Sequence, residues 1–532
     1  MEKIQIKTDL NVTKENIRNL VAKKVGLKEN AILYFRITKR SVDARDKGNI
    51  MLLWSCEYDT KPYVMPTLEI KKCALPKEKV AVIGAGPAGL FCALVLARAG
   101  ICPVVIERGS DVDKRKKDVN AFIERRKLDV NSNVQFGEGG AGTFSDGKLN
   151  SGIKSEYKDF VLSEFVSHGA PECILYDAKP HIGSDKLPET VKNIRKEIIN
   201  LGGEFLFDTE FTDFTAEENK IKKIKLSDST GKISELNVSE VVLAVGHSSR
   251  DTFEMLYNNK VMTERKDMAI GFRIEHSAVD INKAQYGRFY NHPNLDTADY
   301  KLTSNLSERG VFTFCMCPGG YVMPATSEVN AVVVNGMSEF KRDGENSNSA
   351  VVVQVKKEDY GDGNVLKGID FQRKIERKAF ELGGEDYCAP VSLLGDFFAG
   401  RKSVATGRVK PSYPIGVKFA NLNDLLPDFI TEPMKAGIKD MAKRLKGFDD
   451  CDAVLTGAET RTSSPVRVLR NDKMQSVTHS NLYPIGEVGY AGGIMSSAVD
   501  GIKCALCIID KYFVHNAQIQ FFVSKLKLNV DN

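Results

Sequence analysis

The sequence predicts an α/β protein: a Rossmann-type dinucleotide-binding domain, interrupted by an inserted antiparallel-sheet domain and preceded by a small α+β domain. Three observations predict this fold class. A β-branched strand at residues 79–83 leads into a glycine-rich turn and a helical pattern, as in a parallel βαβ unit. Several segments between residues 251 and 452 alternate apolar and polar residues, as half-exposed antiparallel strands do. The first 76 residues have a pattern and a charge of their own.

The glycine-rich turn has the spacing G-x-G-x-x-G. The run V-A-V-I-G-A-G-P-A-G places Gly84, Gly86 and Gly89 at the three glycine positions. The first glycine permits the tight turn, the second lets backbone approach a pyrophosphate, and the third lets the helix pack on the strand. A second strand, 103–106, ends at Glu107, which can accept hydrogen bonds from a ribose diol. This order predicts a dinucleotide site, because a purely structural βαβ unit would leave Glu107 unexplained.

The first 76 residues are predicted to form a separate basic domain. They contain 15 Lys and Arg against 9 Asp and Glu, whereas the whole chain has 75 against 70. The basic excess therefore lies entirely in this segment. Strands at 3–7, 31–39 and 50–58, with a helix at 13–25, give the β-α-β-β order of a split βαβ-like module.

This domain has two interpretations. A sheet with a basic turn such as residues 39–47 can bind RNA. The aromatic residues expected to stack on bases are not obvious, however, and Tyr34, Phe35 and Trp54 can equally belong to the core. We therefore favour a docking or structural domain and expect nucleic acid not to be a partner.

Length and composition limit the number of domains and the location that the sequence allows. A chain of 532 residues is too long for one hydrophobic core, so two or three domains are expected. No segment reaches the ~18 apolar residues of a membrane span, and residues 1–7 lack the apolar region of a signal peptide. We therefore expect a cytoplasmic protein that is not in the membrane. Eleven cysteines without a framework spacing are typical of reduced thiols.

The region 251–452 is predicted to be a substrate domain. Its expected strands are 268–275, 311–316, 321–324 and 331–334, and its expected helices are 371–381 and 430–445. The polar run 343–349 is interpreted as a surface turn.

A distal strand indicates which dinucleotide is bound. The apolar segment 240–246 ends in A-x-G at Ala244 and Gly246. It resembles the segment by which flavoproteins with two dinucleotide-binding domains return to the cofactor sheet. An NAD-only Rossmann enzyme needs no further return strand close to its C-terminus.

Such a strand is present, and it ends at Gly486 and Glu487. It leads through Gly492, Gly493 and Ile494 into a helix of small residues, and resembles the closing FAD motif of the same superfamily. A helix N-terminus beside a flavin favours its anionic reduced form. The resemblance implies FAD rather than NAD.

A fourth motif narrows the family. Residues 136–149 read F-G-E-G-G-A-G-T-F-S-D-G-K-L, a glycine density that indicates backbone lying against something. This segment resembles the uncharacterised bacterial FAD-dependent dehydrogenase family, a branch of the glutathione-reductase-like and aromatic-hydroxylase-like two-domain flavoproteins. The resemblance includes residues 313–321, 411–414 and 459–467 and spans most of residues 1–510. It implies FAD and redox chemistry but supplies no substrate.

Together the motifs predict a non-covalent FAD site and a division into domains. The domains expected are 1–76, a discontinuous FAD-binding domain at 77–250 and 453–515, and the substrate domain at 251–452. The residues expected to bind the cofactor are Gly84, Gly86, Pro87, Ala88, Gly89, Glu107, Arg108, Gly139, Gly140, Gly142, Thr143, Ala244, Gly246, Gly486, Glu487, Gly492, Gly493 and Ile494.

Three side chains are candidates for catalysis. Lys148 follows the glycine-rich loop and could steady negative charge on reduced flavin or substrate; a phosphate contact or a solvated loop is the alternative. Glu459 and Arg461 precede the closing motif, and an arginine fork suits a carboxylate or an enolate oxygen. The alternative for these two is a structural ion pair with each other.

The cysteines and histidines carry weaker signals. Cys315 and Cys317 form C-x-C on an expected strand, with both side chains on one face, and could be a redox pair or half a metal site. No matching pair of ligands follows, so we expect no metal and favour buried thiols. Cys504 and Cys507 lie on the closing helix, where C-x-x-C is a weak redox signal. His247 follows the A-x-G strand and could be a base.

These observations predict an FAD-dependent oxidoreductase. In this hypothesis a hydride passes between flavin N5 and an organic substrate lying against the 268–340 sheet. Since no second G-x-G-x-x-G follows a strand, NAD(P)H could reach the flavin only transiently, which leaves an NAD(P)H-dependent monooxygenase or reductase as the alternative. An alternative of another class is an RNA- or partner-binding protein with a structural or sensing FAD. The oligomeric state is left open.

Overall fold

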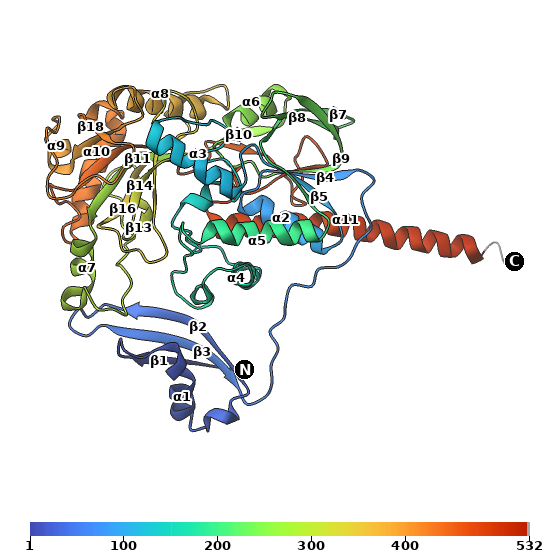
Figure 1. The fold of residues 1–532 in the computed structure, drawn as a ribbon, viewed down its shortest axis with the longest axis horizontal. Coiled ribbons are helices and arrows are strands. Elements are labelled where there is room, and N and C mark those ends of the chain that lie inside the picture. The colour runs from blue at the N-terminus through green and yellow to red at the C-terminus, as the bar shows by residue number, and fades with distance from the viewer. Residues whose placement is uncertain (151, 529–532) are drawn as a thin grey trace.

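The computed structural model describes residues 1–150 and 152–528, with side chains as far as residue 513. Two seven-stranded sheets lie in the body of the molecule. A small domain at the N-terminus is joined to the body by residues 60–78, which contain no helix or strand (Figure 1). The predicted fold class, a Rossmann-type domain with an inserted antiparallel sheet and a small α+β domain, is confirmed.

The first sheet contains five parallel strands of a dinucleotide-binding domain. Their order is β6 (Glu204–Leu206), β5 (Pro103–Ile106), β4 (Lys79–Ile83), β9 (Ile233–Leu243) and β21 (Leu482–Pro484). All but β9 are short, and every residue of β5 and β21 is buried. Because parallel strands end at the same edge of a sheet, the segments that follow β4, β5, β9 and β21 meet there.

An antiparallel meander extends this sheet. β7 (Thr209–Glu217) and β8 (Lys220–Asp228) pair with each other, and β8 pairs with the first half of β9. β9 has eleven residues, so the strand expected at 240–246 begins earlier than predicted and ends at Leu243.

Helices from distant parts of the chain share one apolar core beside the parallel sheet. They are α2 (Pro87–Arg98), α4 (Lys158–Ser167), α5 (Leu187–Asn200) and α11 (Ile494–Leu528). α2 and α11 approach closely, since a Cβ added at Gly501 would lie 2.1 Å from the carbonyl oxygen of Ala88. This contact fixes the start of α11 beside the start of α2.

The second sheet is antiparallel except at one edge. Its order is β12 (Thr303–Ser304), β13 (Val311–Cys317), β16 (Asn346–Val355), β11 (Met268–Ser277), β19 (Val454–Glu459), β17 (Ala389–Leu393) and β18 (Val417–Phe419). Only the pair β17 and β18 is parallel. The two expected helices are α8 (Lys367–Leu382) and α10 (Asp428–Ala442).

Further elements connect and cover the sheets. They are α3 (Val112–Arg125), α6 (Arg250–Asn258), α7 (Ala278–Tyr286), α9 (Leu394–Phe398), and the two-stranded ribbons β10 (Thr263–Arg265) with β20 (Val466–Val468) and β14 (Tyr321–Pro324) with β15 (Val334–Met337). The strand expected at 331–334 thus begins three residues later than predicted.

The interpretation of residues 343–349 as a surface turn is wrong from residue 346 onward. These residues form the buried first half of β16. Their polar side chains are paired inside the protein: Ser347 Oγ accepts a hydrogen bond from Gly319 N at 3.1 Å, and Asn348 Oδ1 accepts one from Arg273 Nε at 2.7 Å. Internal pairing allows a polar sequence to occupy a central strand, and the local sequence does not show it.

The position of β19 differs from the domain boundary expected at residue 453. It lies between β11 and β17, so the last segment assigned to the FAD-binding domain begins with a strand of the inserted sheet. Every residue of β19 is buried. A strand buried on both faces is an apolar run in whichever sheet it lies, so its pattern does not identify the sheet.

The N-terminal domain has the expected β-α-β-β order. β1 (Glu2–Thr8) and β2 (Tyr34–Asp43) flank β3 (Met51–Asp59), which is antiparallel to both, and α1 (Lys14–Val25) connects the first two strands. Trp54 is 2% exposed and donates a hydrogen bond to Thr8. Trp54 is therefore a core residue.

Basic side chains of this domain contact the body of the molecule. Arg36 Nη2 lies 2.9 Å from Asp159 Oδ2, and Arg40 Nε lies 2.7 Å from Asp177 Oδ1. The backbone N–H of Arg40 also donates to the carbonyl oxygen of Tyr176. These contacts hold the N-terminal domain against the body of the molecule. Within residues 1–150 and 152–528, no helix is both long and apolar enough to cross a membrane.

Replacing Gly89 by alanine is expected to disrupt the packing of α2 on β4. The added Cβ would lie 1.9 Å from the carbonyl oxygen of Gly84, a backbone atom that cannot move alone. Overpacking of this kind costs about 1–3 kcal/mol, so the urea midpoint of Gly89→Ala should fall. At Gly310 the nearest atom would be 3.8 Å away, which makes Gly310→Ala a matched control. Equal midpoints for the two variants would contradict the packing argument.

Candidate functional site

A pocket lies at the carboxyl edge of the parallel sheet, where that edge meets the glycine-rich loop and the inserted sheet. The residues predicted to bind the cofactor that line it are Gly84, Gly86, Pro87, Ala88, Glu107, Arg108, Gly140, Gly142, Ala244, Gly246, Glu487, Gly493 and Ile494. The structure thus brings together segments that are more than 100 residues apart in the chain.

The other predicted cofactor residues do not line the pocket: Gly89, Gly139, Thr143, Gly486 and Gly492. Thr143 is buried, and its Oγ1 donates to the carbonyl oxygen of Glu138 at 3.1 Å. A Cβ at Gly139 would lie 2.0 Å from that same Oγ1. These two residues therefore shape the loop from behind.

Two glycine-rich segments lie directly against each other. A Cβ at Gly84, where φ is +103°, would lie 2.4 Å from the carbonyl oxygen of Ala244. A Cβ at Gly140 would lie 3.1 Å from the Cα of Gly86. The pocket wall here is consequently backbone, which can approach a phosphate closely.

Two helix N-termini contribute to the pocket. α2 begins at Pro87 after the N-cap residue Gly86, and α11 begins at Ile494 after Gly493. All four residues line the pocket. The free N–H groups and the dipole at a helix N-terminus attract negative charge, so both ends suit a bound anion such as a pyrophosphate.

The Glu107 carboxylate is held by the backbone. It accepts hydrogen bonds from the N–H groups of Ala85, Gly109 and Gly137 at 2.8, 3.0 and 2.9 Å. A carboxylate offers about four acceptor positions, so one remains for a ribose hydroxyl. Glu107 is therefore oriented for the role predicted from its position after β5.

Arg108 is fixed by two acids. Its Nη2 lies 3.0 Å from Glu210 Oε1 and 2.8 Å from Asp251 Oδ2, while the guanidinium lies 4.5 Å from the ring centroid of Phe136. Arg108 and Phe136 therefore form a stacked pair in the pocket wall.

Arg115 holds the glycine-rich loop, and sequence analysis missed it. This fully buried side chain of α3 donates to the carbonyl oxygens of Asn133, Val134, Gly137 and Glu138. Burial lowers the pKa of Arg115 to about 10. An arginine in the charged run K-R-K-K carries no signal that separates it from its solvated neighbours.

Lys148 lines the pocket on the side of the inserted sheet. Its Nζ lies 3.0 Å from Asp146 Oδ2 and 3.7 Å from Cys317 Sγ. Although burial alone would lower it, the nearby Cys317 and Asp146 raise the pKa of Lys148. Asp146 also accepts a hydrogen bond from Arg342 Nε at 3.0 Å. Lys148 is therefore a fixed, protonated group.

Glu459 and Arg461 do not pair with each other, so the alternative of an ion pair between them is wrong. Glu459 ends β19, lies behind the pocket wall, and pairs with Arg273 of the adjacent β11 at 3.4 Å. Burial raises the pKa of Glu459 to about 7, against the opposing effect of Arg273. Arg461 lines the pocket and turns toward α8.

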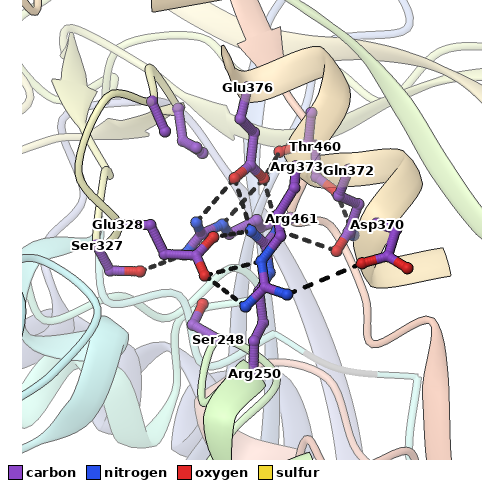
Figure 2. Close-up of polar contacts among 12 residues, drawn as sticks. Ser248, Arg250, Ser327, Glu328, Asp370, Gln372, Arg373, Glu376, Thr460 and Arg461 are labelled. Carbon is purple, nitrogen blue, oxygen red and sulfur yellow. Dashed lines mark hydrogen bonds and ion pairs between the residues drawn. The ribbon is translucent and has the colours of Figure 1, made fainter. Parts of the chain in front are cut away.

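A buried network of ion pairs surrounds Arg461 (Figure 2). Glu376 of α8 accepts hydrogen bonds from Arg250 Nη2 at 2.7 Å, from Arg461 Nη2 at 3.0 Å and from Thr460 Oγ1 at 2.6 Å. Although burial raises it, the two guanidinium groups hold the pKa of Glu376 well below its usual range. The network joins α6 of the cofactor domain to the inserted domain.

His247 lies in the pocket wall just beyond β9. Its Nε2 is 3.4 Å from Glu487 Oε2, and burial lowers its pKa. Glu487 in turn accepts a hydrogen bond from the N–H of Gly493. Ser248 and Gln135, which sequence analysis did not identify, are hydrogen-bonded to each other beside this pair.

One group of side chains has the spacing of a metal site. Ligand atoms of Glu164, His168 and Glu197 lie within 4.8 Å of one another. Arg98 donates to both carboxylates, at 2.6 and 2.7 Å. The group is therefore an ion-pair network built around an arginine.

Replacing Glu376 by glutamine is expected to destabilise the protein by about 3–5 kcal/mol, because removing one partner of a buried ion pair leaves uncompensated charge. Here two guanidinium groups, those of Arg250 and Arg461, would lose their shared carboxylate. Urea unfolding measures the change, and Glu381→Gln at an exposed position of α8 is the control. A loss below about 1 kcal/mol, the size seen for surface pairs, would contradict the role of Glu376.

Comparison with known proteins identifies the domains. Residues 77–125 match an FAD binding domain, residues 267–462 match the C-terminal domain of FAD-dependent proteins, and residues 1–58 match a domain of unknown function. An uncharacterised protein of Clostridium beijerinckii is 46% identical over 529 residues, which cover 96% of this chain and 98% of that protein.

Solved structures give a more distant likeness. A geranylgeranyl bacteriochlorophyll reductase-like protein of Thermoplasma acidophilum is 10% identical, with 86% of this chain and 84% of that chain covered and a TM-score of 0.37. A glycerol-3-phosphate dehydrogenase of Bacillus halodurans, solved with FAD, is 11% identical, with 82% and 64% covered and a TM-score of 0.37.

The pocket fits FAD. The backbone cradle and two helix N-termini suit the pyrophosphate, and the oriented Glu107 carboxylate suits a ribose. The matched FAD binding domain, residues 77–125, contains the turn at Gly84–Gly86, the start of α2 and Glu107, so the predicted FAD is confirmed. The chain therefore belongs to a family of FAD-dependent, oxidoreductase-type flavoproteins that also includes the uncharacterised C. beijerinckii protein.

Proposed function

We propose that the protein is a dehydrogenase that passes a hydride between FAD and a small organic substrate. One observation carries this proposal: a single pocket joins the residues that fit FAD to residues of the inserted domain. Phe314 and Cys315 of β13 and Asn335 of β15 line the same pocket as Gly493 and Ile494. This arrangement supports a substrate lying between the cofactor and the inserted domain.

The protein's own residues hold FAD and orient the substrate. The turn after β4 and loop 137–142 would hold the pyrophosphate, and Glu107 the ribose. When bound, FAD supplies a ring that accepts or donates a hydride. The remaining groups in the pocket then have to position the substrate and supply or remove a proton.

Lys148 is the side chain best placed to orient the substrate. Its ammonium group is held at the pocket wall by Asp146, and with three donors it can reach a substrate oxygen as well. Arg461 is different, because its guanidinium already donates to Glu376 and to Ser327 Oγ. We therefore assign Arg461 a positioning role in the pocket wall.

The first experiment is the visible spectrum of the purified full-length protein, followed by additions in the absence of oxygen. A panel of small hydroxy and amino acids tests direct substrate oxidation, and NADH and NADPH test nicotinamide as donor. Bleaching of the flavin absorption by a member of the panel is expected. Bleaching by NADH or NADPH alone would favour a reductase or monooxygenase, and a protein that cannot bind FAD would contradict the proposal.

Lys148→Met is expected to bind FAD normally and to be reduced poorly. Loss of a charged hydrogen bond of about 1.5–3 kcal/mol corresponds to a reduction in kcat/KM of about tenfold to a hundredfold. Stopped-flow bleaching with the most active member of the panel measures this effect. Lys154→Met, a surface change just beyond the loop, is the control. An unchanged kcat/KM in Lys148→Met would show that Lys148 does not orient the substrate.

Glu107→Leu is expected to bind little FAD. Three backbone N–H groups would lose their acceptor, at about 1–3 kcal/mol for each buried donor left unpaired, and the ribose contact would disappear. The ratio of FAD to protein after gel filtration measures retention. Glu204→Gln, an exposed change on the adjacent β6, should retain FAD. Full retention in Glu107→Leu would contradict the ribose assignment.

A further inference from the structure

The segment Cys315-Met316-Cys317 departs from regular strand geometry. Phe314 pairs with Ala350 and Cys317 with Asn348, so a bulge interrupts β13 between them. Cys315 has φ +43°, a left-handed conformation that is strained for a residue with a side chain. Strain at one residue persists where the surrounding structure enforces it, and it clusters at functional sites.

The bulge gives the two thiols different surroundings. Cys315 is partly exposed and lines the FAD pocket, while Cys317 is fully buried behind it. Cys317 Sγ nonetheless donates a hydrogen bond to the carbonyl oxygen of Cys315 at 3.3 Å, so the buried thiol lies directly against the residue that faces the pocket. One thiol can therefore meet a ligand in the pocket while the other supports it from inside.

Two cations converge on this pair. Arg273 Nη2 lies 3.2 Å from Cys317 Sγ and also donates to the carbonyl oxygen of Cys315. Lys148 Nζ lies 3.7 Å from Cys317 Sγ. The charged and titratable groups that face the pair are Lys148 and Asp146 of the loop, Arg273 of β11, Glu459 of β19, Arg342, and Tyr300.

The acids among these groups are largely occupied. Asp146 binds Arg342 and Lys148, and Glu459 binds Arg273. Cys317, Lys148 and Arg273 hold the pKa of Cys315 well below its usual value, against the effect of burial. Burial and the neighbouring Cys315 raise the pKa of Cys317. Cys317 Sγ donates to the carbonyl oxygen of Cys315 and so keeps its proton, and Cys315, which lines the pocket, is the thiol that ionises first.

We propose that Cys315 and Cys317 are a redox-active dithiol in the wall of the FAD pocket, with Cys315 as the attacking thiolate and Cys317 as the resolving thiol, and that its reaction partner is a small organic disulfide. The sequence favoured buried thiols at these positions, and of the two only Cys317 is buried. The proposal goes beyond the dehydrogenase reaction and does not depend on which substrate reduces the flavin.

The chemistry balances without a further reactant. The Cys315 thiolate attacks one sulfur of a disulfide RSSR, forming a mixed disulfide and releasing one thiolate RS⁻. Cys317 then loses its proton to solvent and attacks the Cys315 sulfur, which forms the Cys315–Cys317 disulfide and releases the second RS⁻. The two cysteines are oxidised by two electrons, and RSSR is reduced to two thiols.

A second pair of close thiols in the protein provides a contrast. Cys92 of α2 and Cys504 of α11 also interact, and both are fully buried in the apolar core of the helices. Burial and the neighbouring Cys92 raise the pKa of Cys504, with no cation among the causes. Thiols in such surroundings are inert. Thiol reactivity should therefore depend on nearby cations and not only on two cysteines being close together.

The test uses the full-length protein with FAD bound and 2,2′-dithiodipyridine as the disulfide, with release of pyridine-2-thione as the readout. In the wild type we expect a fast phase of two thiones per chain, with a Cys315–Cys317 disulfide identified by peptide mass spectrometry. Cys317→Ser should release one thione in the fast phase and keep a mixed disulfide on Cys315. Cys315→Ser should lose the fast phase, and Cys504→Ser should retain it.

The pH dependence supplies a second readout. The fast phase should persist at least one pH unit below the value of about 8.5 at which an ordinary thiol is half ionised, and Lys148→Met should move its midpoint upward. A fast phase that survives in Cys315→Ser, an ordinary thiol midpoint in the wild type, or no fast phase would overturn the proposal. Thione release requires no flavin turnover, so this failure is distinct from failure of the dehydrogenase assay.

Discussion

The pocket depends on close contact between two glycine-rich stretches of backbone, the turn at Gly84–Gly86 and the loop at Gly137–Gly140. A Cβ at Gly140 would lie 3.1 Å from the Cα of Gly86, so a side chain there would press on the turn. Such a contact has few side-chain atoms to hold it, so the loop needs another anchor, and Arg115 provides one through four carbonyl oxygens. Burying a cation is costly, and the converging carbonyl dipoles, together with the nearby acids Glu107 and Glu138, offset that cost here. The loop held in this way donates the Gly137 N–H to Glu107. Anchor, loop and ribose acceptor therefore form one unit.

The inserted domain is tied to this unit by charge as well as by packing. Glu376 forms ion pairs with Arg250 of the cofactor domain and with Arg461 of the segment that follows β19. Both arginines are more than nine-tenths buried, and Glu376 is the carboxylate that they share. The position of Arg461 in the pocket wall is thus set by a residue on a helix of the inserted domain. An ion-pair network at a domain boundary gives orientation more than net stability.

How much could be predicted from the sequence depends on whether a feature is local. The βαβ unit, its glycines and Glu107 are local: their spacing determines the turn, the helix start and the acid at the strand end. The pairing of Glu459 with Arg273 is not local, because it requires β19 to lie beside β11, and an apolar buried strand does not reveal its sheet. The role of Arg115 could not be predicted for the same reason. Its partners are backbone carbonyl oxygens, which every residue has, so no side chain in the sequence indicates them.

The polar start of β16 shows why the hardest segment to predict is also the most informative. Asn348 pairs with Cys317 across the sheet and binds Arg273, which in turn donates to Cys317. An apolar residue at position 348 would leave the Arg273 guanidinium short of an acceptor in the core. A buried strand made of serine and asparagine contradicts the usual hydrophobic pattern, and such local contradictions are expected where function competes with stability. The polar start of β16 was therefore mistaken for a surface turn because of residues such as Asn348. Asn348 holds the Arg273 guanidinium beside Cys315 and Cys317.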